Sequence, residues 1–220
     1  MNHMTYNIDS SIPGWMSERD LGILAKISSL CPEYSSMLEV GAFLGRSTYP
    51  IYANKSKAST LTVVDTFEPT AEYNPDSVRL ATKMHGDPDK IEQALSASRA
   101  SMSWQAGFEL CLGEKICSKL DIHACSSQDY VKTTDFDLVF IDGGHDQETV
   151  QHDIDKFISP TNLLIGDDFG MKYRRFKGLI NAVAISKLKH NRTLLCPADS
   201  RLWILVPNSG HWYHTLGNLL

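Results

Sequence analysis

The 220-residue sequence contains no long apolar run. No stretch approaches the roughly 20 apolar residues that cross a bilayer as a helix. Residues 1–14 are polar and lack the apolar core of a signal peptide. We therefore expect a cytoplasmic protein that does not enter a membrane.

Cysteine is scarce, and its spacing forms no pair of the CxxC type. This absence excludes the usual pattern of a structural zinc site, and the odd number of cysteines supplies no disulfide framework. Buried free thiols in a reducing compartment are the expectation. The five cysteines are Cys31, Cys111, Cys117, Cys125 and Cys196.

Positive charge is also in short supply, with 21 Lys and Arg residues against 26 Asp and Glu residues and a net charge of −5. A nucleic-acid surface needs dense Lys and Arg to neutralise phosphates, so no nucleic-acid partner is expected. The one basic cluster, at 172–177, is typical of a solvated loop or helix face.

What is present indicates a single domain covering residues 1–220. A hydrophobic fraction of 42% and a charged fraction of 21% are those of an ordinary globular chain of this length. Helix-spaced apolar segments alternate with short apolar runs, which predicts a layered α/β sheet. The expected strands are Ser36–Val40, Thr60–Val64, Asp121–Cys125, Phe136–Ile141, Asn162–Ile165, Arg192–Cys196 and Leu202–Val206.

Two helices have clear start signals. Ser17 with Asp20 three residues later resembles a capping box and predicts a helix over 17–30. Asp87, directly before a proline, can start a second helix inside a long insertion at 66–120. We expect the inward face of this second helix to carry Ile91, Ala94, Leu95, Ser98 and Met102.

A glycine-rich turn follows the first strand. Gly41 and Gly45 stand between the strand end at Val40 and a helix start near Ser47. Glycine lets the backbone turn sharply and lets a ligand approach, while N–H groups at the helix start face that ligand. The GxGxxG pattern of dinucleotide binders and the lysine of a phosphate-binding loop are both missing. Pro50 requires the helix to begin at Ser47 or later.

Asp65 closes the second strand, and the glycine turn precedes it in the chain. A carboxylate at the end of this strand can accept both hydroxyls of a ribose. Either feature alone is more often structural, as a plain turn or a solvated strand end. In this order, the two together predict an adenosine-type ligand.

The segment resembles the class I S-adenosylmethionine-dependent methyltransferases, whose first motif is an E-x-G-x-x-x-G turn followed by an acid that ends the second strand. Glu39, Gly41 and Gly45 match the turn, and Asp65 matches the acid. The resemblance runs over 38–207 outside the insertion. It implies a Rossmann-like, seven-stranded, mostly parallel sheet with helices on both faces and the last strand antiparallel.

The same resemblance implies that S-adenosylmethionine is the cofactor. The two glycines would lie beside its methionine part, Asp65 on its ribose, and the turn at 126–129 near its adenine. The residues expected to bind it are Glu39, Gly41, Ala42, Gly45, Ser47, Asp65, Thr66, Ser127 and Asp142.

Acidic side chains follow two later strands of the expected sheet. Asp142 and His145 come after the strand that ends at Ile141, and Asp167 and Asp168 follow the next strand. Because the carboxyl ends of parallel strands share one edge, these residues should lie beside the glycine turn. Their oxygens suit Mg²⁺ or a similar ion. Plainer roles stay open, since Asp142 can bind the cofactor or cap a helix and the Asp pair can solvate a strand end.

The IDGxH and DD patterns resemble the O-methyltransferase branch that includes metal-dependent macrolide-sugar methyltransferases. This resemblance implies that Asp142, Asp167 and Asp168 hold a divalent cation and that His145 and Asp142 are catalytic, with His145 as the base. We expect O-methylation of a small-molecule hydroxyl, on a sugar or another polyhydroxylated metabolite. A non-catalytic nucleotide- or S-adenosylmethionine-binding module is the alternative, whereas the missing GxGxxG disfavours an NAD-dependent oxidoreductase. The sequence leaves a homo-oligomer open.

Overall fold

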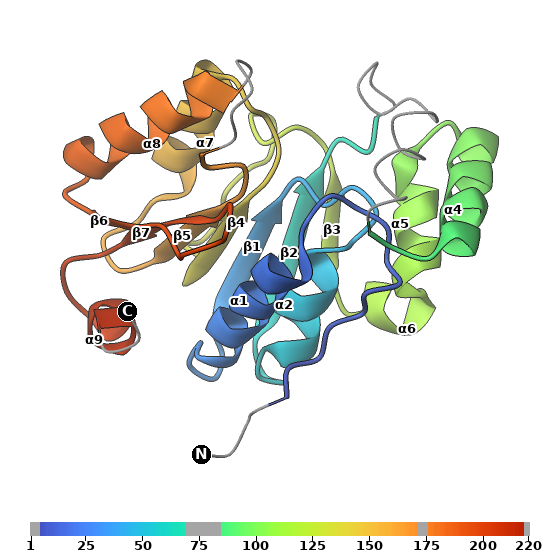
Figure 1. Cartoon of the computed structure of the whole chain (residues 1–220), viewed down its shortest axis with the longest axis horizontal. Helices are drawn as coiled ribbons and strands as arrows, with labels where there is room; N and C mark the ends of the chain where they lie inside the picture. Colours follow the sequence, from blue (N-terminus) through green and yellow to red (C-terminus); the bar gives the residue numbers. More distant parts are fainter. Residues whose placement is uncertain (1–4, 69–84, 171–175, 218–220) are drawn as a thin grey trace.

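The structure, a computed structural model, describes residues 5–68, 85–170 and 176–217 (Figure 1). Its strands are β1 (Ser36–Val40), β2 (Thr60–Asp65), β3 (Asp121–Ala124), β4 (Leu138–Ile141), β5 (Leu163–Gly166), β6 (Thr193–Leu195) and β7 (Trp203–Val206). Its helices are α1 (Glu18–Ser29), α2 (Thr48–Asn54), α4 (Pro88–Ser101), α5 (Trp104–Leu112), α6 (Glu114–Cys117), α7 (Gln147–Phe157), α8 (Lys177–Lys189) and α9 (His211–Gly217).

The strands form one seven-stranded sheet in the order β3-β2-β1-β4-β5-β7-β6. Strands β1 to β5 pair in parallel, and β7 runs antiparallel to both of its neighbours, β5 and β6. The predicted Rossmann-like arrangement is therefore confirmed, including the antiparallel last strand.

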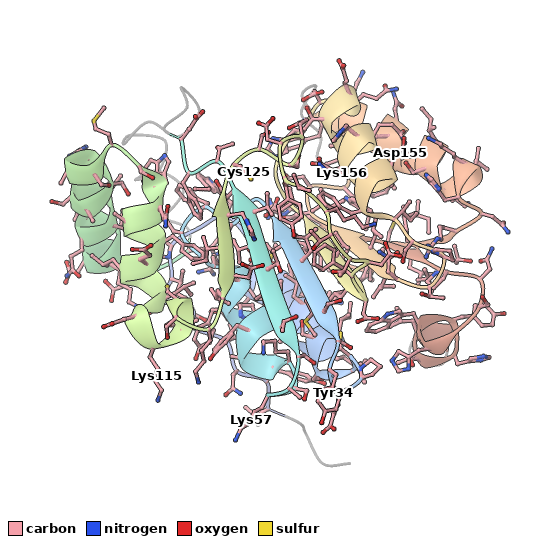
Figure 2. All side chains as sticks on the ribbon, turned by 180° about the vertical axis from the view of Figure 1, so that it is seen from behind. Tyr34, Lys57, Lys115, Cys125, Asp155 and Lys156 are labelled. Atoms are coloured by element: carbon pink, nitrogen blue, oxygen red, sulfur yellow. The ribbon has the colours of Figure 1, made fainter. Side chains whose placement is uncertain are left out.

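The register aligns the ends of the central strands. Val40 pairs with Val64 of β2 and Ile141 of β4, and Ile141 pairs with Gly166 of β5. The residues that follow these strands consequently emerge along a single edge, which we call the carboxyl edge. Figure 2 shows Cys125, just after β3, at the opposite end of the sheet from Tyr34, which precedes β1.

Side chains of the buried strands alternate between two cores. Met37 and Phe140 belong to the core beneath α1, α2, α4 and α5, whereas Leu38 and Val139 belong to the core beneath α7 and α8. Successive side chains of a strand point to opposite faces, so a strand buried on both sides is apolar throughout. Helices therefore cover both faces of the sheet (Figure 1).

Helix starts follow the sequence signals. The Ser17 hydroxyl accepts the N–H of Asp20 at 3.2 Å and donates to the Asp20 carboxylate at 2.6 Å, which closes the predicted capping box of α1. Helix α2 begins at Thr48, so Pro50 lies in its first turn, where a missing N–H costs no helical bond.

Three expectations for individual side chains need correction or fall outside the description. Met102 was expected to face inward, but it is 78% exposed, because its φ of +56° ends α4. The cysteines are free as predicted, but only Cys31 and Cys111 are buried, whereas Cys117 and Cys125 are half-buried and Cys196 is exposed. Residues 172–175 of the basic cluster lie outside the described residues. No helix in the described part of the chain has the length and apolarity to cross a membrane.

Candidate functional site

The glycine turn begins where β1 ends. Gly41 has a φ of +85°, and a Cβ built on it would lie 2.4 Å from the carbonyl oxygen of Asp142. Any side chain at Gly41 would therefore collide with the backbone that follows β4. Gly45 also has a positive φ, of +86°, and a Cβ built on it would lie 2.8 Å from Cγ of Leu112 in α5. The turn is thus packed between a neighbouring strand end and the insertion.

Asp65 holds this turn from the end of β2. Its Oδ2 accepts the backbone N–H groups of Ala42 and Phe43 at 2.7 and 2.9 Å, and its Oδ1 accepts the N–H of Phe67 at 2.6 Å. The predicted pairing of glycine turn and acid is therefore a direct contact. The predicted contact of Asp65 with a ribose stays a prediction.

Glu39 and Ser47 lie beneath the turn rather than on its surface. The Ser47 hydroxyl donates to Glu39 Oε1 at 2.5 Å, and both residues are buried. Burial raises the pKa of Glu39 to about 7, although the hydrogen bond from Ser47 opposes that shift. Within the described ranges, Glu39 Oε2 has no hydrogen-bond partner. Ser47 was expected to donate to a ligand, but its hydroxyl is engaged by Glu39.

Thr66 and Ser127, the remaining predicted cofactor residues, follow β2 and β3 at the carboxyl edge. Thr66 is exposed, and its hydroxyl accepts the backbone N–H of Glu68 at 3.4 Å. Ser127 is buried, and its carbonyl oxygen accepts a hydrogen bond from the ammonium of Lys156 at 2.6 Å. This bond ties the turn after β3 to α7. Figure 2 shows Lys156 on the same side of the molecule as Cys125. Contact between this turn and adenine remains a prediction.

Asp142, His145 and Asp168 come together next to the glycine turn. One ligand atom from each lies within 4.8 Å of the others. His145 Nε2 is 2.7 Å from Asp168 Oδ2, and the His145 ring packs edge-on against Phe176 with 5.0 Å between centroids. These three residues, which we call the Asp–His–Asp group, come from the ends of β4 and β5.

Asp167, the third acid predicted to hold a cation, is not a member of the Asp–His–Asp group. It is buried, and its Oδ2 lies 2.8 Å from Nη2 of Arg201. Burial raises the pKa of Asp167 to about 7, with the charge of Arg201 opposing that shift. Its structural partner is therefore an arginine that the sequence analysis did not single out.

Negative charge is crowded at this edge. Burial raises the pKa of Asp142 well above its usual range, and repulsion from Asp167 and Asp168 raises it further. Arg201 contributes positive charge on one side, and its own pKa is raised by these acids despite the opposing effect of burial. Two carboxylates beside an imidazole form a donor set that can bind a divalent cation.

The structure thus joins the residues on which the sequence argument depends. Asp65 contacts the turn that starts at Gly41, Gly41 abuts Asp142, and Asp142 groups with Asp168. Arg201 was missed because it stands alone before β7, outside any motif. The glycine turn and the Asp–His–Asp group therefore share the carboxyl edge.

Solved structures provide an independent comparison of the fold. A protein from Corynebacterium glutamicum is 13% identical, with a TM-score of 0.56 over 91% of this chain and 85% of that chain. An O-methyltransferase from Bacillus cereus in complex with SAH (S-adenosylhomocysteine) is 14% identical, with a TM-score of 0.50 over 89% of this chain and 84% of that chain. The SAH-bound methyltransferase PaMTH1 from Podospora anserina is 12% identical, with a TM-score of 0.50 over 88% and 80%. These likenesses show the fold.

The family comparison is more specific than the fold. No curated protein matches the sequence. Residues 38–169, however, match the model of a family described as a methyltransferase domain, and they include the glycine turn, Asp65 and the Asp–His–Asp group. Because the match covers more than half of the chain, this protein belongs to the methyltransferase-domain family.

Proposed function

We propose that this methyltransferase transfers a methyl group from S-adenosylmethionine to a hydroxyl oxygen of a small molecule. One observation carries the proposal: Gly41 packs directly against the backbone of Asp142. A Cβ built on Gly41 would lie 2.4 Å from the carbonyl oxygen of Asp142. This packing puts the glycine turn and the Asp–His–Asp group side by side. Methyl transfer depends chiefly on such placement of donor and acceptor.

Several residues fit the proposed cofactor. Asp65 has spare lone pairs beyond its three N–H partners and can still accept a ribose hydroxyl. The unpartnered Oε2 of buried Glu39 is the kind of oxygen that a cationic amino group satisfies. The structurally similar enzymes from B. cereus and P. anserina were solved with SAH, which supports the choice of cofactor.

The Asp–His–Asp group fits a divalent cation such as Mg²⁺ or Mn²⁺. Asp142 and Asp168 would each offer an oxygen and His145 a nitrogen. Burial, and then repulsion from Asp167 and Asp168, raise the pKa of Asp142, and a bound cation would favour its charged form. A bound cation would lower the pKa of an acceptor hydroxyl. In this arrangement His145 is a ligand, which differs from the role as base expected from the sequence.

The contact between His145 and Asp168 favours a second, metal-free arrangement. Asp168 Oδ2 at 2.7 Å from Nε2 would orient the imidazole, as a carboxylate orients a catalytic histidine. The other ring nitrogen of His145, Nδ1, would then take the proton from the acceptor hydroxyl. The two arrangements share the reaction and differ in the need for a cation.

Titration and turnover together test the proposed reaction. SAH should bind the protein in isothermal titration and NAD should not, and labelled S-adenosylmethionine should methylate at least one member of a panel of hydroxylated metabolites. Absence of SAH binding would contradict the proposal. Binding of SAH without transfer to any acceptor would favour the non-catalytic module.

Removal of metal separates the two arrangements, and substitution of His145 tests the role that both give it. EDTA should abolish turnover and added Mg²⁺ should restore it, whereas identical rates would leave the metal-free arrangement. His145→Ala should lower turnover at least about a hundredfold in either arrangement and leave SAH affinity unchanged. The exposed His152 supplies the control, since His152→Ala should alter neither quantity. Full turnover in His145→Ala would remove the residue from the mechanism.

A further inference from the structure

Arg201 is the cationic partner of the acids that follow β5. Its Nη2 lies 2.8 Å from Asp167 Oδ2, and its Nη1 lies 3.3 Å from Asp168 Oδ1. One guanidinium therefore bridges two successive carboxylates. The planar fork of an arginine can make two such bonds at once, whereas a lysine ammonium acts as a point charge.

Arg201 is itself held in place from several directions. Its backbone N–H donates to Oδ1 of the buried Asp20 at 3.3 Å, and its Nη2 donates to the carbonyl oxygen of Trp15 at 3.0 Å. Its own carbonyl oxygen accepts the N–H of Phe169 at 2.8 Å. Helix α1 and the turn after β5 thus hold the backbone of Arg201, and the N-terminal segment holds its guanidinium.

Asp168 needs this support because its backbone is in the left-handed region, with a φ of +65°. Such a conformation is strained for a non-glycine residue and persists only where neighbouring groups hold it. The two oxygens of Asp168 are divided between partners, with Oδ1 toward Arg201 and Oδ2 toward His145. Rotation of the carboxylate would disturb both contacts.

We propose that Arg201 is a positioning residue, which directs Asp168 Oδ2 into the Asp–His–Asp group and keeps Asp167 out of the cation site. The inference rests on the proposed function, because the cation belongs to that function. It assigns Asp167 to the arginine and leaves Asp142, His145 and Asp168 as the ligands. Residues that orient metal ligands typically change metal affinity when they are replaced.

Mn²⁺ binding to Arg201→Lys tests this role without an assay of turnover. The substitution keeps the positive charge and loses the fork, so its effect reports positioning rather than charge. We expect the Kd for Mn²⁺, measured by electron paramagnetic resonance on the full chain, to rise about tenfold or more. Arg19→Lys is the matched control, because Arg19 is exposed and bonds only the carbonyl oxygen of Ala198 among the described contacts. Its Kd should equal that of the wild type.

Arg201→Gln distinguishes positioning from simple charge. If Arg201 acted through its charge alone, Arg201→Lys would bind Mn²⁺ as the wild type does and Arg201→Gln would bind it more tightly. That pair of results would overturn the inference. Failure of the wild type to bind Mn²⁺ would instead refute the cation of the proposed function, and the inference would fall with it.

Asp20→Asn provides a second route if Arg201→Lys does not fold. Asp20 accepts the N–H of Arg201 and the hydroxyl of Ser200 at 2.5 Å, and it is not itself a member of the Asp–His–Asp group. Loosening this hold should weaken Mn²⁺ binding while SAH affinity stays unchanged. Unchanged Mn²⁺ affinity in a folded Asp20→Asn protein would count against the positioning role.

Discussion

Gly41 is the residue at which the glycine turn abuts the backbone of Asp142. Gly41→Ala should unfold the turn or displace it, because the new Cβ would meet the carbonyl of Asp142 at 2.4 Å in addition to the strain of a positive φ. Gly113→Ala separates the backbone strain of a positive φ from a steric clash, since Gly113 has a φ of +79° and nothing lies within 4 Å of its Cβ position.

Urea unfolding and SAH titration compare the two alanine variants. Gly113→Ala should lose about 1–3 kcal/mol of unfolding free energy, because a φ of 79° with a ψ of 152° lies in a region that essentially only glycine adopts, and it should keep its SAH affinity. Gly41→Ala should lose more stability and most of its SAH affinity. Equal losses in the two variants would show that the contact with Asp142 is unimportant.

Glu39 gives the protein a pH dependence of known sign. Its pKa rises from 4.5 to about 7 on folding, so the folded protein binds this proton more tightly than the unfolded chain does. The contribution of Glu39 to stability is therefore present at low pH and falls as the pH rises from about 4.5 to about 7. A glutamine does not titrate, so Glu39→Gln should not lose this stability as the pH rises.

The unfolding free energies of the wild type and Glu39→Gln should be compared at pH 5 and pH 8. Their difference should shift in favour of the variant by up to about 3 kcal/mol at the higher pH, as the pKa change requires. A constant difference would mean that Glu39 titrates normally in the folded protein.

Site residues that stand at strand ends were predictable, and Arg201 was not. Gly41, Asp65, Asp142 and Asp168 follow parallel strands, whose carboxyl ends must meet at one edge. The partners of Arg201 stand 34 residues away at Asp167 and 181 residues away at Asp20. No local pattern connects such distant positions, so only the folded chain reveals that Asp167 is paired.

At the scale of elements, α5 buttresses the glycine turn. Leu112 is buried and packs against Gly45 where a Cβ would point, whereas Leu110 of the same helix is 40% exposed. Leu112→Ala should lower the unfolding free energy by about 2–5 kcal/mol, as buried leucine deletions do. It should also weaken SAH binding, because the turn loses its support.

Leu110→Ala is the control on the same helix. It should cost less than about 1 kcal/mol and leave SAH affinity unchanged, since an exposed side chain leaves no cavity. Urea unfolding with SAH titration measures both variants. If the two leucines behave alike, α5 does not support the turn.

The insertion was predicted to hold one helix, and the structure adds α5 and α6. Gly107 in the middle of α5 disfavours a helix on local grounds. The fold needs it there, because a Cβ at Gly107 would lie 2.6 Å from the hydroxyl of Ser98 in α4. Close packing of two helices thus overrides the local preference, which sequence patterns cannot reveal.

At the scale of the whole molecule, the strands followed from apolar patterns, and the mostly parallel sheet with its antiparallel last strand followed from the resemblance, whereas the order of the strands came only from the structure. The path of the N-terminal segment could not be predicted from the sequence. Arg46 of the glycine turn donates to the carbonyl oxygen of Met16 at 2.8 Å, and the ring centroids of Trp15 and Phe43 are 5.0 Å apart. The backbone N–H of Asp87 donates to the carbonyl oxygen of Ser11 at 2.9 Å. Segments distant in sequence therefore close around the carboxyl edge.

A crystal structure of the protein with SAH and Mn²⁺ tests the central claim most directly, because anomalous scattering locates the metal without assumption. The account predicts SAH along the turn from Gly41 to Gly45, with its ribose at Asp65, and Mn²⁺ bound by Asp142, His145 and Asp168. SAH bound away from the glycine turn, or Mn²⁺ bound apart from these three residues, would contradict it.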